Sequence, residues 1–228
     1  MLGQSNPTPF DVRFWLGNIP VRVHPLFWII SVVMGWGACM PGRPDLLVMW
    51  VLCLFVSILV HEMGHAVMAR AYGYQPEIVL HGFGGYASYF PTHWCGTARA
   101  VMISFAGPAA GFLLLASIVA ISIFLARLQL LPRNDIVEFA LSQMIFINLW
   151  WGLVNLLPVL PLDGGRISEH LWEHFRPADA FVWTRRISLV VAFGVSFYFF
   201  RIDRSYAAFL FLMLGVQNLQ ELQGSRYR

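Results

Sequence analysis

Long runs of apolar residues, separated by short polar segments, dominate the chain. A helix that crosses a lipid bilayer needs roughly 20 mostly apolar residues, and several of the runs approach or exceed that length. The pattern therefore predicts a membrane all-α fold with about six transmembrane helices. The predicted spans are residues 25–40, 46–71, 99–126, 137–157, 181–200 and 206–220.

Two segments between the spans do not have the pattern of a spanning helix. Residues 77–90 (EIVLHGFGGYASYF) are too short and too rich in glycine for a spanning helix. Their alternation and aromatic residues predict a small membrane-associated β-hairpin, or a re-entrant loop, between the second and third spans. Residues 163–176 predict a turn followed by a short amphipathic helix at an interface.

Composition supports a membrane environment. Hydrophobic residues make up 58% of the chain and charged residues 12%, about half the share of an ordinary globular domain. The formal net charge is only +3, every cationic residue except histidine is an arginine, and these arginines are scattered. Nucleic-acid binding would need a basic stripe, so we expect no nucleic-acid partner. The three cysteines form no CxxC pair, which argues against a disulfide scaffold. We expect residues 1–228 to form a single polytopic membrane domain.

The distribution of arginine predicts the orientation in the membrane. Six spans place both termini on one side, and ten of the fifteen arginines then lie on that side. Because cytoplasmic segments carry an excess of Lys and Arg, we expect both termini in the cytoplasm. The expected location is an integral, multi-pass position in the cell membrane. The ten arginines are Arg13, Arg22, Arg70, Arg99, Arg166, Arg176, Arg185, Arg186, Arg226 and Arg228.

The second apolar run continues into the sequence His61-Glu62-Met63-Gly64-His65. Ionisable residues at the end of a bilayer-length run are costly and indicate a functional site. On a helix, His61 and His65 share one face and can bind one metal ion, while Glu62 can act as a general base on a metal-bound water. A solvated polar face is the alternative explanation of this motif, but it fits poorly with an apolar run.

A catalytic zinc ion takes three protein ligands and a water, so a third ligand is needed. Asp163 is the best candidate, because it also ends an apolar span and is followed by Gly164 and Gly165, which let the backbone turn sharply. We expect Pro158 and Pro161 to stop the preceding helix and to hold the segment extended. The alternative is that Asp163 caps a helix at 167–175.

Taken together, the two motifs resemble the site-2 protease family of intramembrane zinc metalloproteases. The family carries HExxH on one transmembrane helix and N-x-x-P…LDG on a later one. The matching residues here are His61, Glu62 and His65, followed by Asn155, Pro158, Leu162, Asp163 and Gly164. The resemblance extends to His24-Pro25-Leu26-Phe27, to the glycine-rich hairpin and to Ala106-Gly107-Pro108. Gly111 is a departure, since many members have Asn there. We expect no attached PDZ or CBS domain, as in the compact branch of the family.

The resemblance implies a function. His61, His65 and Asp163 would hold one Zn²⁺ per chain, and Glu62 would be catalytic. Asn155 would bind the substrate backbone or a developing oxyanion. The expected reaction is the hydrolysis of peptide bonds in or near transmembrane segments of membrane proteins, as in regulated intramembrane proteolysis. The expected partners are a transmembrane protein substrate, the lipid bilayer and a regulatory membrane protein.

Other functions and sites fit the sequence less well. His170, Glu173 and His174 match the inverted motif HxxEH, but their polar surroundings favour a solvated helix face. His24, His81 and His93 fit structural or interfacial roles better than metal ligation. A non-proteolytic metal-binding transporter or channel subunit would need a path of polar residues through several spans, and a membrane iron oxygenase would need more clustered histidines than the seven present.

Overall fold

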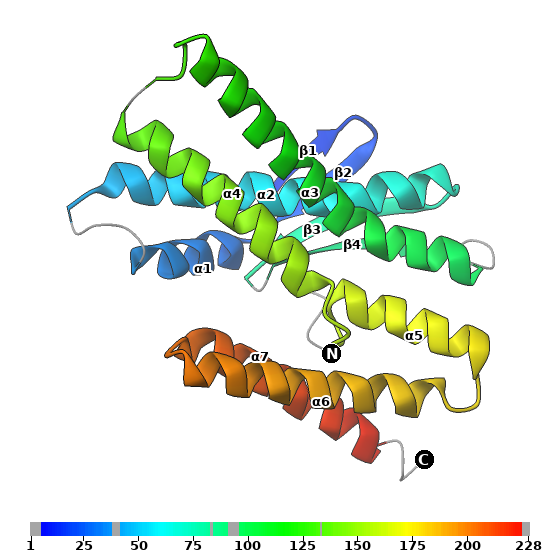
Figure 1. The fold of residues 1–228 in the computed structure, drawn as a ribbon. Helices are drawn as coiled ribbons and strands as arrows, with labels where there is room; N and C mark the ends of the chain where they lie inside the picture. Colours follow the sequence, from blue (N-terminus) through cyan, green and yellow to red (C-terminus); the bar gives the residue numbers. More distant parts are fainter. Residues whose placement is uncertain (1–5, 38–41, 83, 91–95, 133, 225–228) are drawn as a thin grey trace. The chain divides into compact units, whose positions relative to one another are not determined.

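The computed structural model describes all residues except 1–5, 38–41, 83, 91–95, 133 and 225–228 (Figure 1). The described part is mostly helical and contains seven helices and one small sheet, as the apolar pattern predicted in outline. The helices are α1 (Pro25–Trp36), α2 (Pro44–Ala71), α3 (Thr97–Arg127), α4 (Asp135–Asn155), α5 (Asp163–Phe175), α6 (Ala180–Arg201) and α7 (Ser205–Gly224). The strands are β1 (Val12–Leu16), β2 (Ile19–Val23), β3 (Gln75–His81) and β4 (Gly84–Phe90).

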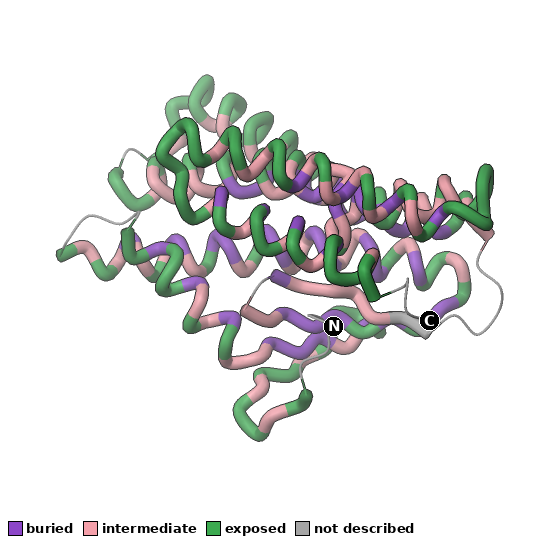
Figure 2. The backbone as a smooth tube through the Cα atoms, turned by 90° about the horizontal axis from the view of Figure 1, so that it is seen from below, coloured by how far each residue is buried: buried purple, intermediate pink, exposed green. Residues whose placement is uncertain are grey.

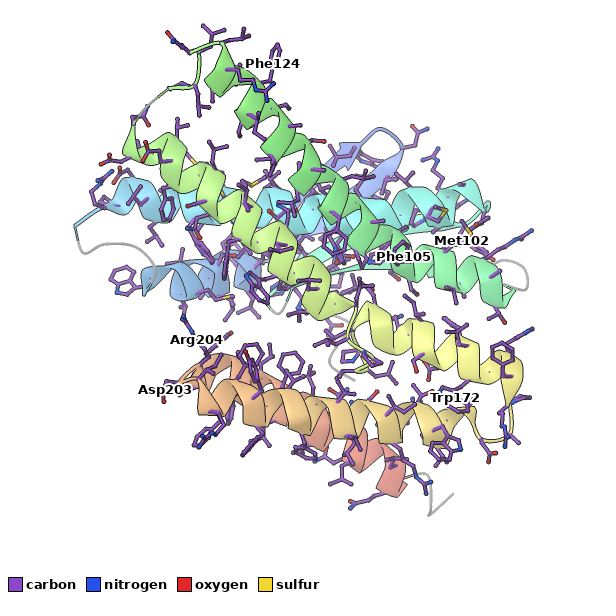
Figure 3. The ribbon with its side chains drawn as sticks, viewed as in Figure 1. Met102, Phe105, Phe124, Trp172, Asp203 and Arg204 are labelled. Atoms are coloured by element: carbon purple, nitrogen blue, oxygen red, sulfur yellow. The ribbon has the colours of Figure 1, made fainter. Side chains whose placement is uncertain are left out.

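Four described helices are long and apolar enough to cross a membrane: α2, α3, α4 and α6. Helix α1 is apolar but has only 12 residues, and α7 is not among the four. Large apolar side chains are exposed on these helices, including Met102, Phe105 and Phe124 of α3 (Figure 3). Leu113 of α3 and Val190 of α6 are each 70% exposed. Exposure of this extent fits lipid rather than water as the surrounding solvent.

The sheet has the order β1-β2-β3-β4. Strands β3 and β4 pair in the antiparallel way, from Gln75 opposite Phe90 to His81 opposite Gly84, and confirm the predicted hairpin. The hairpin of β1 and β2 was not predicted, and β2 joins β3 in parallel register. A local signal for it exists, because Gly17 and Asn18 form a two-residue connection in which Gly17 has a φ of 58°.

Residues group into two compact units, which are described separately. The first comprises Met1–Trp94 and Ala106–Gly152. Its core joins the inner face of the sheet to α1 and α2, and buried residues follow α2 and the central strands (Figure 2). Among the four candidate spans α2 is the most enclosed, with 44% of its most apolar window buried against 6% for α3. The core includes Val21, Val23, Phe27, Cys53, Leu54, Ile58, Ile78 and Leu80.

The second unit comprises Cys95–Phe105 and Leu153–Arg228. Helices α6 and α7 follow one another through a short turn and pack together, with the Ser196 hydroxyl donating to the carbonyl oxygen of Ala208 at 2.7 Å. Helix α5 packs on α6, where Trp172 and Trp183 stack with their ring centroids 5.7 Å apart. This unit carries the segment between α4 and α5.

Candidate metal centre

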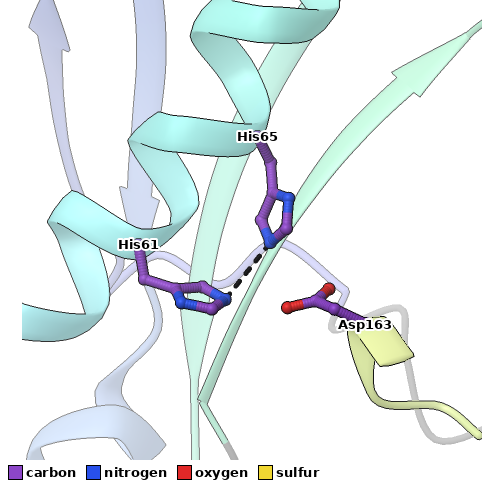
Figure 4. Close-up of side chains that lie close together, drawn as sticks. All are labelled: His61, His65 and Asp163. Atoms are coloured by element: carbon purple, nitrogen blue, oxygen red, sulfur yellow. Dashed lines mark hydrogen bonds between the residues drawn. The ribbon is translucent and has the colours of Figure 1, made fainter. Parts of the chain in front are cut away.

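His61 and His65 lie on successive turns of α2 and are nearly fully buried, at 3% and 7% exposure. Their Nε2 atoms are 3.2 Å apart (Figure 4). Two nitrogen ligands at about 2.05 Å from a tetrahedral zinc ion are separated by about 3.3 Å. The helical spacing of four residues therefore presents the pair at a separation that suits a shared zinc ion.

Small residues allow the backbone of α3 to approach the histidine pair. A Cβ atom at Gly107 of α3 would overlap the imidazole of His65. A Cβ atom at Gly64 of α2 would overlap the carbonyl oxygen of Ala106. One turn after Gly107, a Cβ atom at Gly111 would be 3.8 Å from the nearest heavy atom. Glycine is thus required for space at positions 64 and 107, as in close helix contacts within membranes.

Glu62 is buried at 4% exposure and lies beside the sheet. The nearest strand is β4, where a Cβ atom at Gly85 would be 2.6 Å from Glu62 Cγ and 2.8 Å from Leu80 Cδ2. The glycine-rich hairpin therefore provides the space for the side chain of Glu62.

Asp163 is the first residue of α5 and is half-buried. The N-cap of α5 is Leu162, so the alternative in which Asp163 caps a helix at 167–175 is wrong. Gly164 and Gly165 are buried against the preceding segment, where a Cβ atom at Gly165 would be 2.5 Å from Leu160 N. The two glycines were expected to permit a sharp turn, but they lie in the first turn of helix α5, where they permit close packing against the preceding segment.

The segment before Asp163 is not extended, contrary to the prediction made from Pro158 and Pro161. It folds into tight turns, in which Val159 N–H donates to Leu157 at 2.7 Å and Leu162 N–H donates to Val159 at 2.8 Å. Compact packing against the two glycines favours turns over the extended conformation that proline alone would allow.

Asn155 is the last residue of α4 and is buried, at 9% exposure. Asn148, on the same helix, is buried at 2% and donates from Nδ2 to the hydroxyl of Ser57 on α2 at 2.9 Å. This bond ties α4 to the helix that carries the histidine pair. Sequence reasoning did not assign Asn148 a role, although an amide inside an apolar span is a signal for one.

The competing motif on α5 lies at the surface. His170 Nδ1 is 3.1 Å from a carboxylate oxygen of Glu173, and their side chains are 30% and 55% exposed. His174 is exposed, and none of these three belongs to a group that could hold a metal among the described residues. The arrangement matches the expected solvated face.

The remaining histidines have structural surroundings where they are described. His24 caps α1, its Nδ1 accepting from the N–H of Leu26 at 3.2 Å. His81 ends β3, where burial lowers the pKa of its imidazole and the neighbouring groups His24 and Arg22 lower it further. His93 lies outside the described residues.

Several known proteins and one family model are similar to this chain. Residues 129–199 match the model of Peptidase family M50. The Mycobacterium tuberculosis protein Rip3 is 34% identical over 198 residues, in an alignment that covers 78% of this chain and 48% of Rip3. A zinc metalloprotease of Methanocaldococcus jannaschii is 32% identical over 160 residues, 69% of this chain and 44% of that protein. The chain belongs to peptidase family M50, the site-2 protease family.

The fold of this M50 protein agrees with that membership. The solved structure of the site-2 protease from Methanocaldococcus jannaschii matches it with a TM-score of 0.64 at 21% identity, over 93% of this chain and 95% of the other. The chain spans about half the length of the curated relatives it matches, at 48% and 44% of the two named above.

Proposed function

We propose that this M50 protein is an intramembrane zinc metalloprotease that hydrolyses peptide bonds in or near transmembrane segments of other membrane proteins. The observation that carries the proposal is the buried pair His61 and His65, with Nε2 atoms 3.2 Å apart, on an apolar helix long enough to span a bilayer. Ionisable side chains inside a membrane-length apolar helix are costly to place and mark a functional site.

His61, His65 and Asp163 are proposed to hold one zinc ion. Each offers one ligand atom of a kind that zinc accepts, an imidazole nitrogen or a carboxylate oxygen. Zinc held by these two imidazoles and this carboxylate would keep one position open for water. It would supply a water of lowered pKa and would polarise the scissile carbonyl group.

Glu62 is proposed as the general base, which takes a proton from the attacking water and later donates it to the leaving amine. Its place next to His61 and beside Gly85 supports this role. Asn155 is proposed to donate to the substrate backbone or to the oxyanion, and its burial fits a polar group retained for function.

The substrate is proposed to bind as an extended strand along β4. Helical peptide bonds are hidden by their own hydrogen bonds, so the cleaved segment must unwind. β4 is an edge strand of the described sheet, and an edge strand can accept a further strand by backbone hydrogen bonding. Because Gly85 of β4 adjoins Glu62, a peptide on this edge would pass close to the proposed base.

The protein is proposed to be an integral, multi-pass protein of the cell membrane with both termini in the cytoplasm. The four apolar helices support a membrane location, and the excess of arginine on the side of the termini supports the orientation. Regulated proteolysis, controlled by a membrane partner, is proposed from the family resemblance.

The decisive experiment compares the purified full chain with Glu62→Gln, Asp163→Ala and His174→Ala in detergent or nanodiscs. We expect about one zinc per chain and cleavage of a transmembrane test substrate in the wild type. Glu62→Gln should keep the metal and stop cleavage, Asp163→Ala should bind metal much more weakly, and His174→Ala should change neither metal content nor cleavage. Full activity of Glu62→Gln, or loss of metal in His174→Ala alone, would contradict the proposal.

A further inference from the structure

We propose that Ser188 of α6 and Asn218 of α7 are positioning residues, which hold Leu160 and thereby set the position of the Asp163 carboxylate. The two side chains and the backbone of Leu160 are called the Leu160 clamp below. The inference deepens the proposed function and rests on it, because it takes Asp163 to be a zinc ligand.

The clamp engages both backbone groups of one residue. The N–H of Leu160 donates to the Ser188 hydroxyl oxygen at 3.0 Å. Asn218 Nδ2 donates to the Leu160 carbonyl oxygen at 2.9 Å. Ser188 is fully buried and Asn218 is 2% exposed. Two helices that follow the segment in sequence therefore hold the two peptide groups that flank Leu160.

The orientation of Asn218 is itself fixed. Its Nδ2 also donates to the carbonyl oxygen of Leu214, one turn earlier on α7, at 2.8 Å. Each of the two amide hydrogens thus has one acceptor, so the side chain cannot rotate without losing a bond. Burying a serine and an asparagine in this way is costly unless their hydrogen bonds are made.

Leu160 is rigidly connected to Asp163. A Cβ atom at Gly165 would be 2.5 Å from Leu160 N and 2.5 Å from the Val159 carbonyl carbon, so the first turn of α5 lies directly on the clamped residue. Val159 is fully buried, and Leu162 N–H donates to its carbonyl oxygen at 2.8 Å. A shift of Leu160 must therefore move the start of α5, where Asp163 lies.

A metal-binding side chain needs contacts that fix its position. A ligating carboxylate has to stay within about 0.5 Å of its productive position, and residues that orient ligands typically contribute about 10- to 100-fold in metal affinity. Asp163 stands at the start of a helix after a segment of turns, so its place depends on how that segment is held. The Leu160 clamp provides a hold from α6 and α7.

The test measures zinc affinity of the full chain in detergent by competition with a chromogenic chelator, for Ser188→Ala and Asn218→Ala. Each variant should bind zinc about tenfold more weakly. Ser196→Ala is the matched control, because Ser196 also lies on α6 and donates to a backbone carbonyl, that of Ala208, without touching the segment before Asp163. It should leave zinc affinity within about twofold of the wild type. If Asn218→Ala fails to fold, Asn218→Leu, similar in size and without the donor, takes its place.

Two further measurements separate positioning from general stability. In the metal-free protein, Ser188→Ala and Ser196→Ala should lower the unfolding temperature to a similar extent. Only Ser188→Ala should also weaken zinc binding. In an Asp163→Ala background, Asn218→Ala should weaken zinc binding no further, since the effect acts through Asp163. Additive losses, unchanged affinity in both clamp variants, or an equal loss in Ser196→Ala would overturn the inference.

The outcomes also separate this inference from the proposed function. If Asp163→Ala binds zinc as tightly as the wild type, the proposed ligand set is wrong and the clamp inference is wrong with it. If Asp163→Ala loses affinity while both clamp variants keep it, the ligand set stands and only the clamp inference is overturned.

Discussion

Gly85 of β4 faces Glu62 of α2 so closely that a Cβ atom on Gly85 would lie 2.6 Å from Glu62 Cγ. The two residues are far apart in sequence and come from a strand and a helix that pack together in the first unit. The strand thus limits where the proposed catalytic carboxylate can lie.

Gly85→Ala should displace Glu62 and lower kcat about 100-fold, because a misplacement of about 1 Å of a catalytic group can have that effect. Zinc content should stay as in the wild type, since the histidine pair is untouched. Single-turnover cleavage and metal analysis check both quantities. An unchanged kcat in Gly85→Ala would contradict the close packing of Glu62 against β4.

Gly107→Ala should weaken zinc binding, because the added methyl group overlaps the His65 imidazole. The expected loss of zinc affinity is about tenfold or more, measured by chelator competition. Gly111→Ala is the matched control on the same helix, since a Cβ atom there would be 3.8 Å from the nearest atom, Asn148 Oδ1. Equal effects of the two substitutions would contradict the packing of His65 against Gly107.

Removal of zinc should abolish cleavage and lower the unfolding temperature, because a ligand that binds only the folded state stabilises it. Zinc at 100 times its Kd stabilises by about 2.7 kcal/mol. Dialysis against a chelator followed by scanning calorimetry measures the shift, and added zinc should restore both stability and activity. An unchanged unfolding temperature after complete removal would argue against the site.

Asn148→Ala should destabilise the first unit by about 1–3 kcal/mol, because it leaves the buried Ser57 without the donor from α4. Urea or thermal unfolding in detergent measures the loss. Ser142→Ala is the control, since Ser142 is exposed on α4 and donates only within its own helix, to Phe139. A loss in Ser142→Ala as large as that in Asn148→Ala would speak against a specific link between α4 and α2.

We expect His81 to make the free energy of unfolding decrease as the pH is lowered. Burial lowers its pKa below the ordinary value of 6.5, and His24 and Arg22 act in the same direction. Between the lowered pKa and 6.5 the unfolded chain binds more protons than the folded protein, so stability rises with pH. The folded protein therefore has the full contribution of neutral His81 to its unfolding free energy above pH 6.5. It loses this contribution as the pH falls from 6.5 toward the lowered pKa. His81→Gln should show a smaller difference in unfolding free energy between pH 7.5 and pH 5.5, and an equal difference would contradict the assignment.

Much of the fold could be predicted from local patterns. The apolar runs predicted the long helices α2, α3, α4 and α6 to within a few residues, because a helix in lipid must be apolar along its length. Alternation and glycines predicted the hairpin of β3 and β4. The number of membrane crossings stays a prediction, since α1 is short and α7 is not among the helices that length and apolarity single out.

By itself, the sequence determined the chemistry available to this protein. A spacing of four residues places His61 and His65 on one helix face, and the surrounding apolar run makes a solvated role for them costly. Only the tertiary structure decided what surrounds that chemistry. It places Gly107 against His65 and Gly85 against Glu62, folds the segment before Asp163 into turns, and holds Leu160 from Ser188 and Asn218. These contacts join residues distant along the chain, so no local periodicity encodes them, and they depend on which small or polar side chains meet when the elements pack.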